Sequence, residues 1–222
     1  MSMTPGSHNY RKMAIDIKAN KEEFCSLLRS TRRDGIEYVI QDLEEDGFFE
    51  APASAGHHLN VEGGLVQHSL NTYRVAHMLW EYLQPLEPSV KTSVKEESVI
   101  LASLLHDVCK ANIYKPTVKK RRNALGVVTD VPGYDVSYRH MPLGHGEKSV
   151  IQLLYSGLDL HEDEMLAIRW HMGAFGLNQF AWEDVRSFDA ARTLSPLVAI
   201  IQAADSLSAS ILETTAEDID HL

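Results

Sequence analysis

The segment 104–110, with the sequence LLHDVCK, constrains this chain more than any other because it places a histidine and a carboxylate at the end of an apolar helix. Residues 99–103 before it are almost all apolar, so the segment should be carried into the interior, where a charge needs a partner. His106 and Asp107 would point about 100° apart on a helix and can bind one centre from two directions. A divalent metal ion is the natural partner, although a surface His-Asp pair is a common alternative.

The length of 222 residues fits one domain with a full core. We expect that domain to occupy 19–215, after a disordered or frayed leader at 1–18 and before an acidic tail at 216–222. The chain from Glu213 onward is expected to be solvated. No internal repeat divides the domain.

The formal net charge of -10 argues against a protein that coats nucleic acid by general electrostatics. Small anionic substrates remain compatible if positive charge is supplied locally. Cys25 and Cys109 cannot form a disulfide framework or a Cys-x-x-Cys zinc site, and Cys109 is interpreted as a small buried hydrophobe. Without a signal peptide or an apolar run near the ~20 residues of a membrane span, the sequence predicts a cytoplasmic protein with no membrane contact.

Apolar spacing predicts a series of helices separated by turn residues. A turn-rich stretch is expected at 51–60 and a loop after Pro85 and Pro88, whereas 175–193 gives no clear pattern. A capping box of Ser93 and Glu96 should open the helix that carries the His-Asp pair. The expected helices begin near Asn20, Asp34, Gly64, Ser93, His145, His161 and Pro196, the last of them capped by Ser195.

Between these helices, strand-like and turn residues alternate over about 112–139, which predicts a small inserted β-hairpin. The insertion contains a basic cluster in an otherwise acidic chain. A solvated charged turn and a phosphate-binding arm are both consistent with this cluster. Its members are Lys115, Lys119, Lys120, Arg121 and Arg122.

Polar side chains that commonly bind metals lie on, or at the end of, the expected helices and mostly on their apolar sides. They are His68, His106, Asp107, His145, His171 and Asp205. Nitrogen and oxygen donors without thiolate suit Fe, Mn, Mg, Ni or Zn, as one or two divalent ions per chain. Two ions that share one carboxylate would use the whole set. His57, His77, His140 and His161 are expected to be ordinary surface, packed or capping histidines.

This ordered set resembles the motif of the HD-domain metal-dependent phosphohydrolases. The resemblance runs from about Gly56 to Leu212 and includes 62–65, 105–110, 143–147, 169–173 and 204–205. It is nearest to the HD part of bacterial exoribonucleases that trim RNA from the three-prime end, and to small bacterial HD proteins without assigned substrates. The sequence is expected to depart from those exoribonucleases at its N-terminal end, because residues 1–49 are too short and too helical in pattern for their OB-fold region. The resemblance implies an all-α HD-domain helical bundle with the β-hairpin as an insertion.

The resemblance also implies roles for individual residues. His68, His106, Asp107 and Asp205 would hold one metal, and Asp107 would bridge to a second metal held by His145 and His171. Lys110 would contact the substrate phosphate, although a lysine here can also balance the helix dipole. His58 would contact substrate or protonate the leaving group.

The function implied is hydrolysis of a phosphate ester or phosphodiester in a nucleotide, or in short RNA or DNA, with metal-bound water as the nucleophile. Two alternatives stay open. One is an HD-fold di-iron oxygenase, and the other is a nucleotide-binding sensor module that holds metal without turnover. The sequence specifies neither the substrate nor the oligomeric state.

Overall fold

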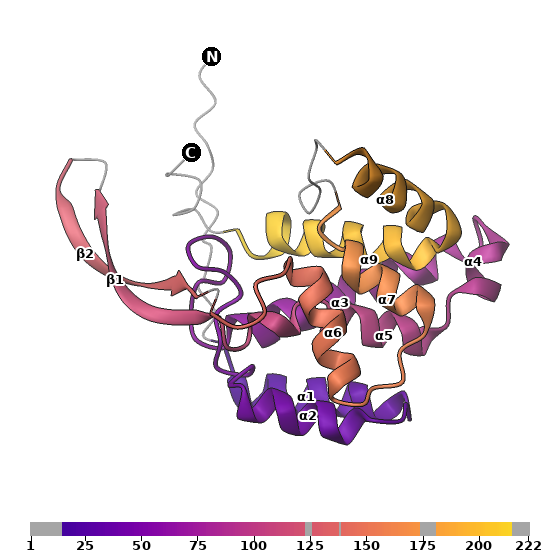
Figure 1. Ribbon diagram of the computed structural model, residues 1–222, viewed down its shortest axis with the longest axis horizontal. Helices are drawn as coiled ribbons and strands as arrows, with labels where there is room; N and C mark the ends of the chain where they lie inside the picture. Colours follow the sequence, from indigo (N-terminus) through magenta and orange to yellow (C-terminus); the bar gives the residue numbers. More distant parts are fainter. Residues whose placement is uncertain (1–14, 123–125, 138, 174–180, 215–222) are drawn as a thin grey trace, which may run out of the picture.

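Apolar stripes fold most of the chain into helices, and a computed structural model describes them over residues 15–122, 126–137, 139–173 and 181–214 (Figure 1). The helices are α1 (Ile17–Ser30), α2 (Ile36–Glu45), α3 (Gly64–Leu83), α4 (Pro88–Ser93), α5 (Glu96–Leu105), α6 (His145–Tyr155), α7 (Glu162–Trp170), α8 (Trp182–Leu194) and α9 (Pro196–Leu207). The described residues also form a 3-10 turn η1 (Val108–Lys110) and a π turn η3 (Ser208–Leu212). The predicted all-α class with one small hairpin is confirmed.

Helix α5 forms the centre of the bundle, and its residues from Ser98 to Leu105 are all buried. Helix α3 packs against both α5 and α9, and α9 packs in turn against α7. This arrangement surrounds the end of α5 with other helices, so the polar residues that follow Leu105 enter the interior. The expectation of an apolar helix that carries the His-Asp pair inward is confirmed.

Helices α1 and α2 lie together on one side of the bundle (Figure 1). Phe24 of α1 anchors them, because its ring lies 5.1 Å from that of Phe48 and 5.6 Å from that of Phe49. Helix α1 begins at Ile17, before the expected start at Asn20, because the Asp16 side chain accepts a hydrogen bond from the Ala19 amide at 3.0 Å.

Two details between α3 and α5 differ from expectation. The predicted loop contains α4, because Pro88 fits the first turn of a helix and Glu87 caps it through the Ser89 amide. The predicted capping box of Ser93 and Glu96 is wrong, because the Ser93 hydroxyl donates to the Ser89 carbonyl at 2.7 Å instead of accepting from a main-chain amide of α5. Helix α5 therefore begins at Glu96 without a side-chain cap.

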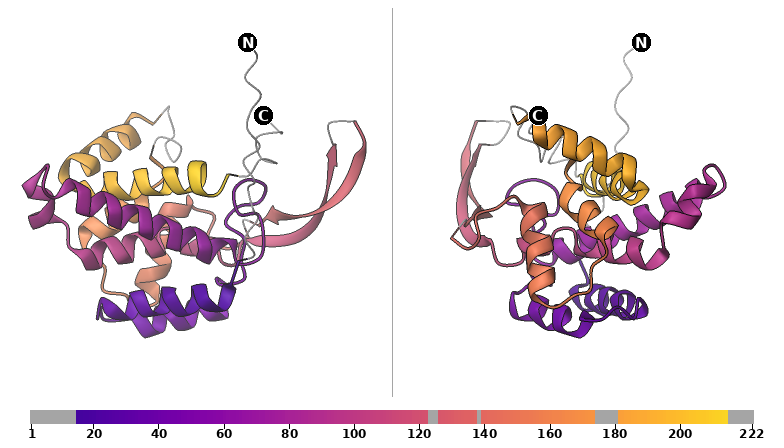
Figure 2. Two further views of the ribbon diagram at one scale, coloured as in Figure 1. Left: turned by 180° about the vertical axis from the view of Figure 1, so that it is seen from behind. Right: turned by 45° about the vertical axis from the view of Figure 1, so that its right-hand side comes forward.

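Strands β1 (Tyr114–Arg122) and β2 (Val128–Val136) form the predicted hairpin. They pair antiparallel, with Tyr114 opposite Val136 and Arg122 opposite Val128. The hairpin extends away from the bundle in both views of Figure 2, so only its base lies near the helices.

Helix α8 occupies part of the segment for which the sequence gave no clear pattern. Pro196 begins α9 as predicted, but Ser195 makes no capping bond, and its buried hydroxyl has no partner within the described residues. None of the described helices is by itself long and apolar enough to span a membrane, and only α8 joined to 196–212 passes that test, as a pair bent by 107°.

Candidate metal centre

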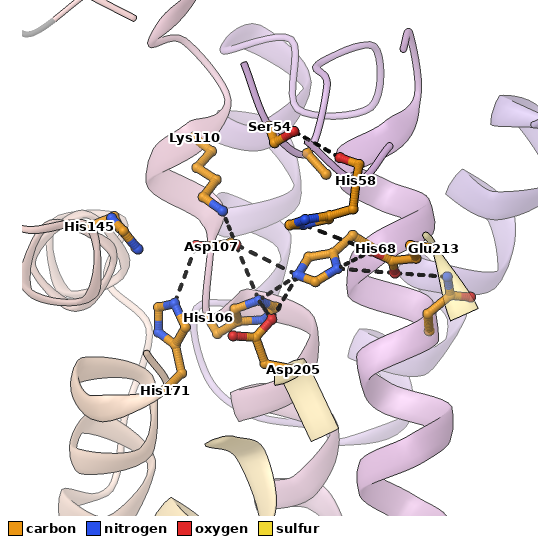
Figure 3. Close-up of polar contacts among 12 residues, drawn as sticks. Ser54, His58, His68, His106, Asp107, Lys110, His145, His171, Asp205 and Glu213 are labelled. Carbon is orange, nitrogen blue, oxygen red and sulfur yellow. Dashed lines mark hydrogen bonds and ion pairs between the residues drawn. The ribbon is translucent and has the colours of Figure 1, made fainter. Parts of the chain in front are cut away.

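The six ligand-type residues predicted from the sequence converge on one place in the bundle (Figure 3). His68 lies on α3, His106 and Asp107 directly follow α5, His145 begins α6, His171 directly follows α7, and Asp205 lies on α9. Of these, His68, His106, Asp107 and His171 are at most 1% exposed. Side chains far apart in the sequence thus form one buried polar cluster.

One half of the cluster is built around the Nε2 atom of His68. This atom lies 3.1 Å from Oδ1 of Asp205 and 3.2 Å from Nε2 of His106. Oδ2 of Asp107 lies 3.3 Å from Nε2 of His106 and 3.8 Å from Nε2 of His68. The ligand atoms of His68, His106 and Asp205 lie within 4.8 Å of one another, so these three residues form one candidate metal site. Oδ2 of Asp107 lies beside this site.

The other half begins at the second oxygen of Asp107, whose Oδ1 lies 3.4 Å from Nε2 of His171. The rings of His171 and His145 are 5.5 Å apart. Oδ1 of Asp107 and the Nε2 atoms of both histidines are buried and have no hydrogen-bond partner within the described residues. Buried polar atoms normally have partners, so this set of acceptors fits a second cation.

The opposite ring nitrogens explain why the Nε2 atoms point to the centre. Nδ1 of His106 lies 2.8 Å from the Ser103 carbonyl oxygen, and Nδ1 of His171 lies 2.7 Å from that of Ile168. An oxygen acceptor requires a proton on Nδ1, which leaves the Nε2 lone pair for a metal. Both rings use the carbonyl three residues earlier, so the helix ends themselves orient the ligands.

Glu213 orients His68 in the same way, and sequence analysis missed it. Its Oε2 lies 2.9 Å from Nδ1 of His68, and its Oε1 accepts a hydrogen bond from Asn71 at 2.9 Å. The expectation that the chain is solvated from Glu213 onward is wrong at this residue, which is 3% exposed. The π turn η3 returns the chain to α3, and the Glu213 amide closes it on the Ser208 carbonyl.

The electrostatics of the cluster follow from burial and from its carboxylates. Burial alone would lower the pKa of His68, but Glu213 and Asp205 raise that pKa to about 10. Burial opposes ionisation of Asp107, yet Lys110 and His106 hold the pKa of this carboxyl well below its usual range. Asp107 is therefore an anion and a strong ligand at neutral pH.

Lys110, at the end of η1, places its Nζ 2.6 Å from Oδ2 of Asp107. The ammonium also faces a cavity of about 620 Å³ above the cluster, whose lining includes His58, His145, His171 and Asp205. Cavities of this size accept small organic ligands. Lys110 is thus positioned between the cluster and any molecule in the cavity.

His58 lies in the turn-rich stretch before α3, with its ring 5.0 Å from that of His68. Gly64 makes this approach possible, because a Cβ atom there would lie 2.1 Å from the Leu59 carbonyl oxygen. Burial, reinforced by the charge of His68, lowers the pKa of His58 to about 4. His58 is therefore a neutral ring at pH 7, next to the cavity.

The remaining histidines divide into two groups. His77 is paired with Glu96 at 3.2 Å, and the main-chain amide of His161 donates to Glu164 at the start of α7. Neither residue lines the cavity. His57 and His140 were not expected to have a role at the site, but both line the cavity. Their position in loops gave no periodic signal from which this could be predicted.

The basic cluster of the hairpin does not converge on the cavity. Lys115 and Lys120 are exposed and stand opposite Asp135 and Asp130 in the strand pair. Lys119 donates to the Ala55 carbonyl at 3.0 Å. Among the basic residues of β1 whose side chains are described, none lines the cavity, which favours the solvated alternative.

Comparison with known proteins gives one result that covers most of this region. A family model described as HD domain matches residues 65–210, which contain all six ligand-type residues. No curated protein and no solved structure matches the chain.

Proposed function

The chain belongs to the HD domain family, and from this premise we propose that it is a metal-dependent phosphohydrolase acting on a phosphate ester or phosphodiester of a nucleotide or short oligonucleotide. The observation that carries the proposal is the position of Asp107. Its Oδ2 faces His68 and His106, whereas its Oδ1 faces His171. One carboxylate between two sets of ligands is the arrangement needed to hold two ions close together.

His68, His106, Asp107 and Asp205 would hold one ion, and Asp107, His145 and His171 would hold the other. When bound, divalent ions lower the pKa of water and neutralise charge on phosphoryl oxygens. Imidazole and carboxylate donors suit Mn, Fe, Ni or Zn, and Mg is compatible with the carboxylates. The buried acceptors without partners, Oδ1 of Asp107 and the Nε2 atoms of His145 and His171, support this fit.

Two further residues would act on the substrate directly. Lys110 would bind a non-bridging phosphate oxygen, because its ammonium faces the cavity beside Asp107. His58 is neutral at pH 7, which favours a hydrogen bond to substrate over protonation of the leaving group. Hydrolysis forms a bond from the water oxygen to phosphorus and breaks the ester P–O bond, and a water proton ends on the leaving oxygen.

The test is hydrolysis by protein reconstituted with Mn²⁺, Fe²⁺, Ni²⁺, Zn²⁺ or Mg²⁺. Nucleotides are assayed by phosphate release, and cyclic nucleotides and short oligonucleotides are assayed by chromatography of the nucleotide products. We expect turnover of one substrate class that is lost on chelation and restored by metal. Absence of turnover with every metal would contradict the proposal. Oxygen consumption without hydrolysis of any phosphate ester or diester would instead support the di-iron oxygenase alternative.

A further inference from the structure

The cavity above the cluster has an uneven distribution of charge. Asp205 is the only carboxylate in its described lining, and it lies on the side of the metal ligands. The lining contains two lysines, Lys110 and Lys148. The cavity lining is therefore less acidic than the chain as a whole, whose net charge is -10.

The two lysines differ in their partners. Lys110 is paired with Asp107, whereas no carboxylate within the described residues pairs with Lys148. The ammonium of Lys148 donates to the His140 carbonyl at 3.2 Å, although the residue is only 6% exposed. An ammonium has three N–H donors, and a buried charge without a counter-charge is unfavourable. Lys148 therefore has N–H donors beyond the one given to His140, and it lies in the lining of the cavity.

Lys148 lies next to the metal ligands but is separate from them. It follows His145 by three residues on α6, so the two side chains share one face of the helix with Cβ atoms about 5 to 6 Å apart. An anion at Lys148 would thus be adjacent to a phosphate held over His145 and His171, not identical with it. The anion at Lys148 and the phosphate over His145 and His171 can belong to one ligand molecule.

An apolar wall completes the cavity on the side of the hairpin. It consists of Ile113, Tyr114, Val136, Met141 and Leu143. Leu143 is 47% exposed and Val136 is 37% exposed, so this wall has contact area available for a ligand. A nucleoside base has the flat, largely apolar surface that such a wall can bind.

We propose that Lys148 binds a second phosphate of the substrate, one that is not hydrolysed, so that the site selects nucleotides with at least two phosphate groups over monophosphates. The identity of the first phosphate, the one over the metals, rests on the proposed function. The second phosphate can be part of a diphosphate, a 3′,5′-bisphosphate or a dinucleotide, which share the same charge and oxygen acceptors.

The test is equilibrium binding of AMP, α,β-methylene-ADP and adenosine 3′,5′-bisphosphate to the Mn²⁺-loaded protein. Loss of a charge-assisted hydrogen bond costs roughly 10- to 100-fold in affinity. We expect the wild-type protein to prefer at least one two-phosphate ligand over AMP by that factor, and the preferred ligand identifies the position of the second phosphate. Lys148→Met should abolish the preference with little change for AMP.

Two controls make the result specific. Lys148→Arg keeps the charge and should keep most of the preference, and Lys91→Met removes an exposed lysine of α4 and should change nothing. Equal wild-type affinities, or a preference retained by Lys148→Met, would overturn the inference. Affinities count only where the ligand is recovered intact, so absence of hydrolysis of any substrate would count against the proposed function alone.

Discussion

Oε2 of Glu213 lies 2.9 Å from Nδ1 of His68, and this contact joins the end of the described chain to the centre of the metal-ligand cluster. It fixes the ring of His68 so that Nε2 faces His106 and Asp205. A carboxylate behind a histidine ligand orients the ring and increases its basicity. The contact therefore couples the C-terminal π turn to metal binding.

Replacement of Glu213 with Gln should weaken metal binding by about 10- to 100-fold, because outer partners of histidine ligands typically contribute that much. Competition with a chromophoric chelator measures this affinity directly. Glu22→Gln, at an exposed position of α1, is the matched control. An unchanged affinity in Glu213→Gln would mean that the contact is not a support for His68.

Lys110→Met should reduce kcat/KM for phosphate substrates by about 10- to 100-fold, since a charge-assisted hydrogen bond to the substrate is lost. Metal stoichiometry should stay close to that of the wild-type protein, because Lys110 is not a ligand. Steady-state kinetics and metal analysis on the same preparation separate the two effects. Unchanged kinetics in the variant would show that Lys110 does not bind the substrate and only neutralises the charge of Asp107.

Metal binding should release protons in a way that depends on pH. The carboxylates of Glu213 and Asp205 raise the pKa of His68 to about 10, so at pH 7 its ring carries a proton on both nitrogens. The Nε2 proton must leave before a metal binds, which predicts release of about one proton from this ring and an affinity that rises with pH up to about 10.

Calorimetry in buffers of different ionisation enthalpy measures the number of protons released. The release should fall in Glu213→Gln, because one of the carboxylates that raise the pKa is removed. Metal affinity that is independent of pH between 7 and 9 would show that His68 is already neutral, contrary to this prediction.

Gly146→Ala should destabilise the protein by about 1–3 kcal/mol, the usual cost of overpacking a close contact. A Cβ atom at this position would lie 2.2 Å from the Arg169 carbonyl oxygen, so α6 must move away from α7. This movement separates His145 from His171 and should weaken the second metal more than the first. Thermal unfolding and metal titration test both effects, with Gly56→Ala, which meets no atom within 4 Å, as the control.

Much of the centre was predictable because its ligands lie among apolar residues at helical spacing. His68, His171 and Asp205 follow apolar stripes of their helices, and buried polar residues in such positions require partners. The orientation of the rings was not predictable, because the partners of their Nδ1 atoms are main-chain carbonyls or a distant carboxylate. Nothing in the local sequence specifies those contacts.

The contact of Glu213 with His68 was not predicted for a related reason. The residues after it are acidic, and composition alone suggested a solvated end. The π turn Ser208–Leu212 changes the helical register just before it, so extrapolation of the α9 stripe does not place its side chain. Lys148 was not singled out either, because a single lysine on an amphipathic helix is normally exposed.

The central claim is that Asp107 holds two metal ions between its two oxygens. Elemental analysis of anaerobically purified and metal-reloaded protein, wild type beside Asp107→Ala, tests it most directly. We expect about two ions per wild-type chain. The variant should lose both ions and should no longer hydrolyse the substrate. A variant that retains its metal and its activity, or a wild-type protein that binds no metal after reloading, would contradict the account.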